Sequence, residues 1–101
     1  MNNFINLSDI SKNDLRKIIE NAKLFKAKKN SKDVMNSLIG KTLIMIFEKP
    51  STRTRLSFEL AMKQLGGHIL VLNPKESHYG SGNENIYDTA KVLSQYGDIV
   101  M

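Results

Sequence analysis

Apolar residues recur with a helical period in the first third of the chain. Over residues 12–29 they return every three or four positions, a spacing that predicts a helix with one apolar face. Ser11 precedes this stretch and Asp14 follows three positions later, a pairing that resembles a capping box at a helix start. We therefore expect a first helix over residues 12–29 and a further short helical turn over residues 33–38.

Beyond Gly40 the period changes, and apolar runs typical of strands alternate with helical spacing. Residues 42–47 form a nearly continuous apolar run, which predicts a strand buried on both faces, as in a parallel sheet. Pro50 cannot continue a central strand, so the strand ends before it. The remaining predicted elements are a helix ended by Gly66 and Gly67, a strand over residues 68–72, a helix over residues 86–96 and a strand over residues 98–101.

This order of strand, helix, strand, helix and strand predicts an α/β fold. Right-handed crossovers would give a parallel sheet with flanking helices, in a βαβαβ arrangement. In such sheets, ligands bind beyond the carboxyl ends of the strands. Two polar loops, residues 48–55 and 73–84, follow strands and are therefore expected at that edge.

Composition bounds the size and the location of the protein. Its 101 residues are enough for one small domain, and the sequence has no run of eighteen apolar residues, so we expect no membrane span. The amino-terminal residues lack the basic start and apolar core of a signal peptide. The absence of cysteine excludes disulfides and thiolate chemistry, and it fits a cytoplasmic protein.

The net charge of +5 raises the possibility of a nucleic-acid partner. Much of the excess lies in one segment, at Lys12, Arg16, Lys17, Lys23, Lys26, Lys28, Lys29 and Lys32. This segment has no interleaved aromatic residues and no nucleic-acid-binding motif, so it indicates a solvated helix face, and we expect no nucleic-acid partner. Steeply salt-dependent binding to DNA or RNA would favour the opposite interpretation.

A dense polar cluster lies between the first predicted strand and the helix that follows. Ser51, Thr52 and Thr54 supply hydroxyl groups, while Arg53 and Arg55 supply planar guanidinium groups suited to phosphate or carboxylate oxygens. A helix start adds unpaired N–H groups and a partial positive charge, which favour an anion. The cluster therefore predicts a phosphate or carboxylate site.

A structural interpretation of the same residues stays open at this point. Ser51 or Thr52 could simply cap the helix, because hydroxyl caps are frequent. The arginines could be solvated or paired with Glu48 and Glu59. Residue types and spacing do not decide between a cap and an anion site.

A resemblance to a known family extends the prediction. Residues 47–55, Phe-Glu-Lys-Pro-Ser-Thr-Arg-Thr-Arg, followed by Ser57, Phe58 and Glu59, resemble the carbamoyl-phosphate signature of the aspartate and ornithine carbamoyltransferases. Residues 84–94 resemble the helix after the second loop in that family, and the resemblance runs over nearly the whole chain. It implies transfer of a carbamoyl group from carbamoyl phosphate to an amine, with release of phosphate.

The resemblance also implies residue roles. Ser51, Thr52, Arg53 and Thr54 match the positions that bind carbamoyl phosphate, with Arg53 and Thr54 as the catalytic pair. Arg53 would hold the phosphate and the carbonyl oxygen, Thr54 would lie nearest the carbonyl, and Arg55 would be structural. Neither a cofactor nor a metal is implied, since His68 and His78 lack ligand spacing.

The choice between the two branches rests on the flanking residues. Phe47, Glu48, Lys49 and Pro50 resemble the ornithine branch, whereas the aspartate branch more often has Phe-Phe-Glu-Pro and a lysine in the second loop. Between Ser77 and Glu84 no lysine occurs. Ornithine enzymes often place a glutamine in this loop that reaches the neighbouring subunit; here His78 or Tyr79 lies near that position, as a possible intersubunit contact.

The largest departure from the family is length, because its chains are about three times as long. We expect residues 1–101 to form a truncated carbamoyl-phosphate-binding domain that lacks the amino-acid-binding domain, so that ornithine would bind only with the missing part. The full-length family members are usually trimers, and the piece alone is expected to be inactive. The alternatives are a fragment of an aspartate carbamoyltransferase, which serves pyrimidine synthesis, and a non-catalytic module that binds a small anion.

Overall fold

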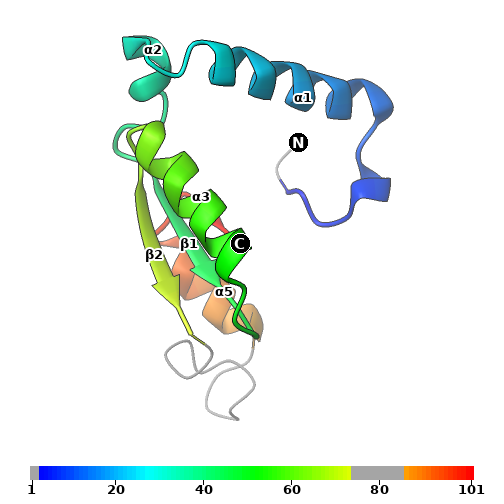
Figure 1. Ribbon diagram of the computed structural model, residues 1–101. Helices are drawn as coiled ribbons and strands as arrows, with labels where there is room; N and C mark the ends of the chain where they lie inside the picture. The colour runs from blue at the N-terminus through cyan, green and yellow to red at the C-terminus, as the bar shows by residue number, and fades with distance from the viewer. Residues whose placement is uncertain (1–2, 74–85) are drawn as a thin grey trace. The chain divides into compact units, whose positions relative to one another are not determined.

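Two compact units, Met1–Ser31 and Lys32–Met101, make up the chain. The computed structural model in Figure 1 describes residues 3–73 and 86–101, and each unit is described by itself. The predicted second loop, with His78 and Tyr79, lies outside the described residues.

The first unit contains a short 3-10 turn, η1 (Leu7–Asp9), and helix α1 (Lys12–Ala27). The predicted cap at Ser11 is confirmed, because the Ser11 hydroxyl accepts a hydrogen bond from the backbone N–H of Asp14 at 3.1 Å. The helix ends before residue 29, the predicted end, since Lys28 leaves helical geometry while its N–H still bonds to the carbonyl of Leu24.

The second unit carries the predicted βαβαβ order. After the single turn α2 (Lys32–Met35), the chain forms β1 (Thr42–Ile46), α3 (Thr52–Gln64), β2 (His68–Leu72), α5 (Ile86–Ser94) and β3 (Ile99–Val100). The three strands are parallel in the order β2-β1-β3, and α3 and α5 lie on opposite faces of the sheet (Figure 1). The predicted fold class is therefore confirmed, with element ends shifted by one to three residues.

β1 is the central strand, and its side chains form the core on both faces. Leu43, Ile44 and Met45 are all at most 5% exposed, which confirms the prediction of a strand buried on both faces. On one face, Leu43 and Met45 pack with Met62 of α3. On the other, Ile44 leaves no room for a side chain at Gly97, where a Cβ would lie 2.7 Å from its Cδ1 atom.

The outer strands are less covered than β1. In β2, Leu70 is 50% exposed and Val71 is 37% exposed, so this strand is buried only in part. β3 is short, but its backbone pairing continues at Met101, whose N–H bonds to the carbonyl of Ile44 at 2.8 Å and whose carbonyl accepts from Ile46 at 2.7 Å. The sheet therefore has two edges that present apolar side chains to solvent.

The turn from α3 to β2 requires glycine. Gly66 has a φ of +84°, in the left-handed region, and a Cβ there would lie 2.6 Å from the carbonyl oxygen of Met35. The predicted stop at Gly66 and Gly67 is confirmed, with the helix itself ending at Gln64. Beyond the turn, His68 donates its N–H to the carbonyl of Lys41 at 2.8 Å, which sets the start of β2 beside β1.

Candidate functional site

The carboxyl end of β1 is where the connections of the sheet diverge. One crossover, through α3, leads to β2 on one side of β1, while β3 pairs on the other side. Such a switch point leaves a crevice outside the strand ends, where ligands bind in open α/β sheets. The loop from β1 to α3, and with it the predicted anion site, lies at this edge of the sheet (Figure 1).

The first turn of α3 directs backbone donors out of the helix. The N–H of Arg55 bonds to the carbonyl of Ser51 at 2.9 Å, so the N–H groups of Thr52, Arg53 and Thr54 precede the intrahelical ladder. No acidic residue lies in this turn, which leaves the positive end of the helix dipole without a carboxylate of its own. These are the features that a helix start needs in order to bind an anion.

The alternative of a simple hydroxyl cap does not hold for this helix. Ser51 occupies the cap position, yet its side chain makes no capping hydrogen bond, and Thr52 is already within the helix. In the following turn of α3, Ser57 donates its hydroxyl to the carbonyl of Thr54 at 2.9 Å. The Ser51 hydroxyl is therefore not used to stabilise α3 in the described structure.

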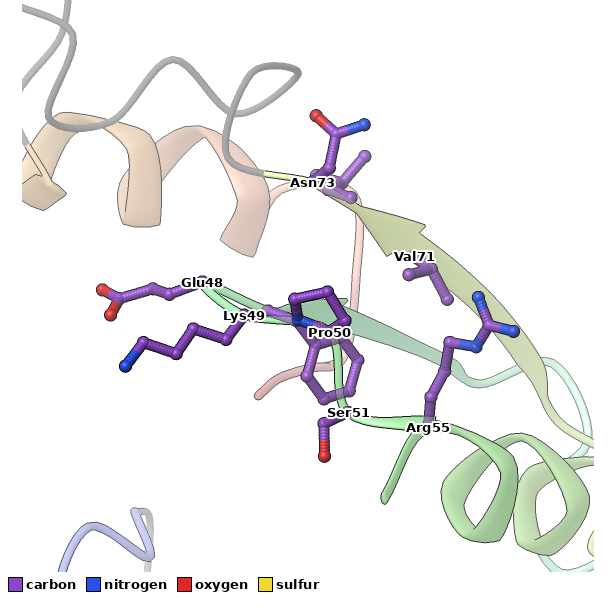
Figure 2. A pocket seen from close by; sticks show the side chains of 9 residues that line it. Glu48, Lys49, Pro50, Ser51, Arg55, Val71 and Asn73 are labelled. Atoms are coloured by element: carbon purple, nitrogen blue, oxygen red, sulfur yellow. The ribbon is translucent and has the colours of Figure 1, made fainter. Parts of the chain in front are cut away.

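A cavity of about 440 Å³ lies between the β1–α3 loop and the end of β2. It is lined by Phe47, Glu48, Lys49, Pro50, Ser51, Arg55, Val71, Leu72 and Asn73, as Figure 2 shows. Among the four residues predicted to bind carbamoyl phosphate, Ser51 lines this cavity. Thr52, Arg53 and Thr54 are solvent-exposed on the first turn of α3 and do not line it.

Arg55 has a place in the cavity that the sequence did not indicate. Its Nε atom lies 3.8 Å from Oε1 of Glu59, which confirms the predicted pairing with an acidic neighbour. Both side chains are at least one-third exposed, so the pair adds little stability. In Figure 2 the guanidinium group lies toward Val71, while Glu48 and Lys49 extend to the other side of Pro50. The two arginines of the signature therefore differ in position, since only Arg55 lines the cavity.

A second cavity, of about 360 Å³, lies between α5 and the ends of β1 and β3. Its lining among the described residues consists of Ile46, Glu48, Thr89, Ala90, Leu93, Val100 and Met101. Thr89 is 5% exposed, and its hydroxyl has no hydrogen-bond partner within the described structure. The sequence placed Thr89 in a helix but gave no sign that its hydroxyl would be buried.

Two further observations concern metals and membranes. Among residues 3–73 and 86–101, no group of three or more His, Asp or Glu side chains is placed to hold a metal ion. His68, at the start of β2, is solvent-exposed. In the same described part of the chain, no helix is both long enough and apolar enough to cross a membrane.

Comparisons with known proteins agree with this geometry. A chain called ornithine carbamoyltransferase from Brucella ovis is 50% identical over 98 residues, which are 97% of this chain and 31% of that one. The ornithine carbamoyltransferase structure from Pyrococcus furiosus matches with a TM-score of 0.82 and 48% identity, over 95% of this chain and 30% of that one. The catalytic subunit of aspartate transcarbamoylase from M. jannaschii matches with a TM-score of 0.86 and 39% identity, over 99% of this chain and 33% of that one.

The chain thus spans about a third of the length of the relatives that it matches. The sequence model of one family, described as aspartate/ornithine carbamoyltransferase, carbamoyl-P binding domain, matches residues 2–101. With the βαβαβ fold and the loop at the end of β1 in place, this match shows that the chain belongs to the aspartate/ornithine carbamoyltransferase family, in its carbamoyl-phosphate-binding domain.

Proposed function

We propose that this chain supplies the carbamoyl-phosphate-binding part of an ornithine carbamoyltransferase. Such an enzyme transfers the carbamoyl group to ornithine, giving citrulline and phosphate, a reaction of arginine metabolism. The observation that carries the proposal is the first turn of α3, where exposed N–H groups coincide with Ser51, Thr52, Arg53 and Thr54 at the switch point of the sheet.

The chemistry needs donors rather than a nucleophile from the protein. When the amine attacks the carbonyl carbon, negative charge develops on the carbonyl oxygen and then on the departing phosphate. In the proposal, Ser51, Thr52 and the N–H groups of α3 bind the phosphate, while Arg53 and Thr54 stabilise the charge on the carbonyl side. Donors that are already in position stabilise this charge without reorganisation.

Ornithine is favoured over aspartate as the acceptor by the relatives. Ornithine carbamoyltransferases from Brucella ovis and Pyrococcus furiosus are 50% and 48% identical to the chain, against 39% for the aspartate enzyme from M. jannaschii. The high structural likeness to the aspartate enzyme, with a TM-score of 0.86, keeps aspartate as the second candidate. A non-catalytic module that binds a small anion is the third.

The proposal extends to parts that lie outside the chain. Residues 1–101 would form a truncated binding domain, and ornithine would require the amino-acid-binding domain of the longer relatives. The full enzyme would be a cytoplasmic homotrimer, with His78 or Tyr79 as a contact between subunits. On this proposal the 101-residue chain binds carbamoyl phosphate and does not form citrulline alone.

Titration of the chain with carbamoyl phosphate tests the anion site. Amide signals of residues 51–55 in a ¹⁵N-labelled sample should shift on addition of the ligand, and Arg53→Ala should abolish the shifts. Arg16→Ala, which removes an arginine from α1 in the other unit, is the matched control and should bind as the unchanged chain does. Equal binding by both variants would remove Arg53 from the site.

A chimaera tests whether this chain can supply the carbamoyl-phosphate-binding half of an active enzyme. The 98 aligned residues of the Brucella ovis enzyme are replaced by this chain, and carbamoylation of ornithine and of aspartate is measured with the same preparation. Citrulline formation that is lost in the Arg53→Ala chimaera is the expected result. A folded chimaera that forms no citrulline would favour the non-catalytic binding module, while activity with aspartate serves only as a check on the acceptor domain of the Brucella ovis enzyme.

A further inference from the structure

Helix α3 begins without the features that stabilise the start of α1. Ser11 caps α1 with φ −65° and ψ 153°, whereas Ser51 has φ −142° and ψ 80° and its hydroxyl makes no capping hydrogen bond. The first turn of α3 contains no acidic residue. It begins instead with Thr-Arg-Thr-Arg, and the cations of Arg53 and Arg55 are unfavourable at the positive end of a helix dipole. The amino-terminal turn of α3 is therefore weak in its local interactions.

Packing does not compensate in this half of the helix. Within the described structure, the buried residue of α3 is Met62, which lies near the carboxyl end of the helix. Nearer the start, Leu56 is 51% exposed and Phe58 is 41% exposed. A segment with few buried apolar contacts opens locally at a low free energy. The order of the amino-terminal turn thus depends on what binds to its backbone donors.

A phosphate dianion would supply what this turn lacks. The N–H groups of Thr52, Arg53 and Thr54 have no hydrogen-bond partner in the part of the chain that the structure describes, so phosphate oxygens would accept from them. Its negative charge is favourable both at the helix dipole and beside guanidinium groups. One bound group would therefore replace the absent cap and the absent carboxylate together.

We propose that the bound phosphate group is the N-cap of α3, so that occupancy of the anion site orders the amino-terminal turn of the helix. This inference rests on the proposed function and concerns the regulation of the same site. In the free chain the turn opens readily, carbamoyl phosphate closes it, and the departure of phosphate loosens it again. A ligand shifts such an equilibrium by its preference for the ordered state.

Ser51→Asp tests whether the cap position is vacant when no ligand is present. An aspartate there accepts hydrogen bonds from the first turn and adds a negative charge, so exchange of the amide hydrogens of residues 55–57 should slow about fivefold. Ser51→Ala cannot cap and should leave these rates near those of the unchanged chain. Ser11→Asp is the matched control, because it replaces a cap that is already made at the start of α1. Unchanged rates in Ser51→Asp would overturn the proposal.

Addition of ligand tests the coupling itself. Carbamoyl phosphate and inorganic phosphate share the phosphate group, so each at saturation should slow amide exchange at residues 55–57 of the unchanged chain. Potassium chloride of equal ionic strength should not. In Ser51→Asp neither ligand should slow exchange further, and carbamoyl phosphate should bind less tightly than to Ser51→Ala, because a carboxylate repels the dianion.

The possible results separate this inference from the proposed function. If carbamoyl phosphate binds while exchange at residues 55–57 is unchanged, the coupling is wrong and the binding proposal stands. If carbamoyl phosphate slows exchange and saturating inorganic phosphate does not, the carbamoyl group and not the phosphate group acts on the turn, which overturns the cap. Absence of any binding overturns both proposals.

Discussion

At the scale of single residues, two serines at helix starts have different roles. Ser11 caps α1 through its bond to Asp14, whereas Ser51 makes no such bond at the start of α3. Ser11→Ala should therefore destabilise α1 by about 1 kcal/mol, while Ser51→Ala should cost α3 much less. Amide hydrogen exchange in the two helices measures both effects. If Ser51→Ala weakens binding of carbamoyl phosphate while the amides of α3 stay as protected as before, Ser51 contacts the anion. If Ser51→Ala lowers the protection of α3 as much as Ser11→Ala lowers that of α1, Ser51 is a helix cap.

Two glycines have positive φ values, but only one of them also lies close to another part of the backbone. Gly40, with a φ of +76°, has no atom within 4 Å of a built Cβ, while the Cβ of Gly66 would lie 2.6 Å from the carbonyl oxygen of Met35. Gly40→Ala should cost about 1–2 kcal/mol, which is the price of a left-handed alanine. Gly66→Ala should lower the free energy of unfolding by more than Gly40→Ala does, because the turn must also move away from the carbonyl of Met35. Urea unfolding of the two variants gives the difference, and equal midpoints would contradict the close approach.

At the scale of elements, the Asp98 carboxylate adds a side-chain hydrogen bond to the backbone bonds that join β1 and β3. Asp98 accepts a hydrogen bond from the N–H of Thr42 at 2.8 Å and returns its own N–H to the Thr42 carbonyl at 2.9 Å. Asp98→Ala should therefore speed amide exchange at Met101, by loosening β3 from β1. Lys41→Ala is the control: it removes only an exposed ion pair of 3.8 Å and should change exchange little. If both variants change exchange equally, the ion pair between Lys41 and Asp98, and not the hydrogen bond to Thr42, is what stabilises the pairing of β3 with β1.

The elements also show how far the sequence could predict the structure. Periodicity predicted the strand order along the chain and placed residues 68–72 in the strand that the structure contains. It could not predict that β2 would be half exposed, because exposure depends on neighbours that the pattern of one strand does not encode.

The candidate site was predictable in position and less so in detail. The signature placed Ser51 at the start of a helix after a buried strand, which is where the structure has it. The presence of Arg55 in a cavity, and of an unpaired Thr89 hydroxyl in another, follows from how three elements meet in space. Roles in binding for Thr52, Arg53 and Thr54 remain predictions.

At the scale of the whole molecule, much apolar surface is left uncovered. The exposed large side chains in the second unit include Leu56, Phe58, Leu60, Leu70 and Val100, each more than 40% exposed. We expect the isolated chain to associate as its concentration rises, because such surface is shielded by contact with another chain. Analytical ultracentrifugation over a range of concentrations measures this.

A charge on the exposed edge should reduce that association. Leu70→Lys places a lysine on β2, where edge strands are protected from pairing by charged residues. Tyr96→Lys, at a 71% exposed position after α5, is the control and should have a smaller effect. A monomer with a sharp, cooperative thermal transition at all concentrations would contradict the expectation.

The place of β1 in the sheet has a consequence for synthesis on the ribosome. β1 is made before both strands that cover its edges, and Asp98, which joins it to β3, lies 56 residues after Thr42. At about 5–20 residues per second, roughly 3 to 11 seconds pass between the emergence of these two residues. During that interval an uncharged, apolar strand has an unpaired edge, so the nascent chain should be a substrate for chaperones well before it can bind any anion.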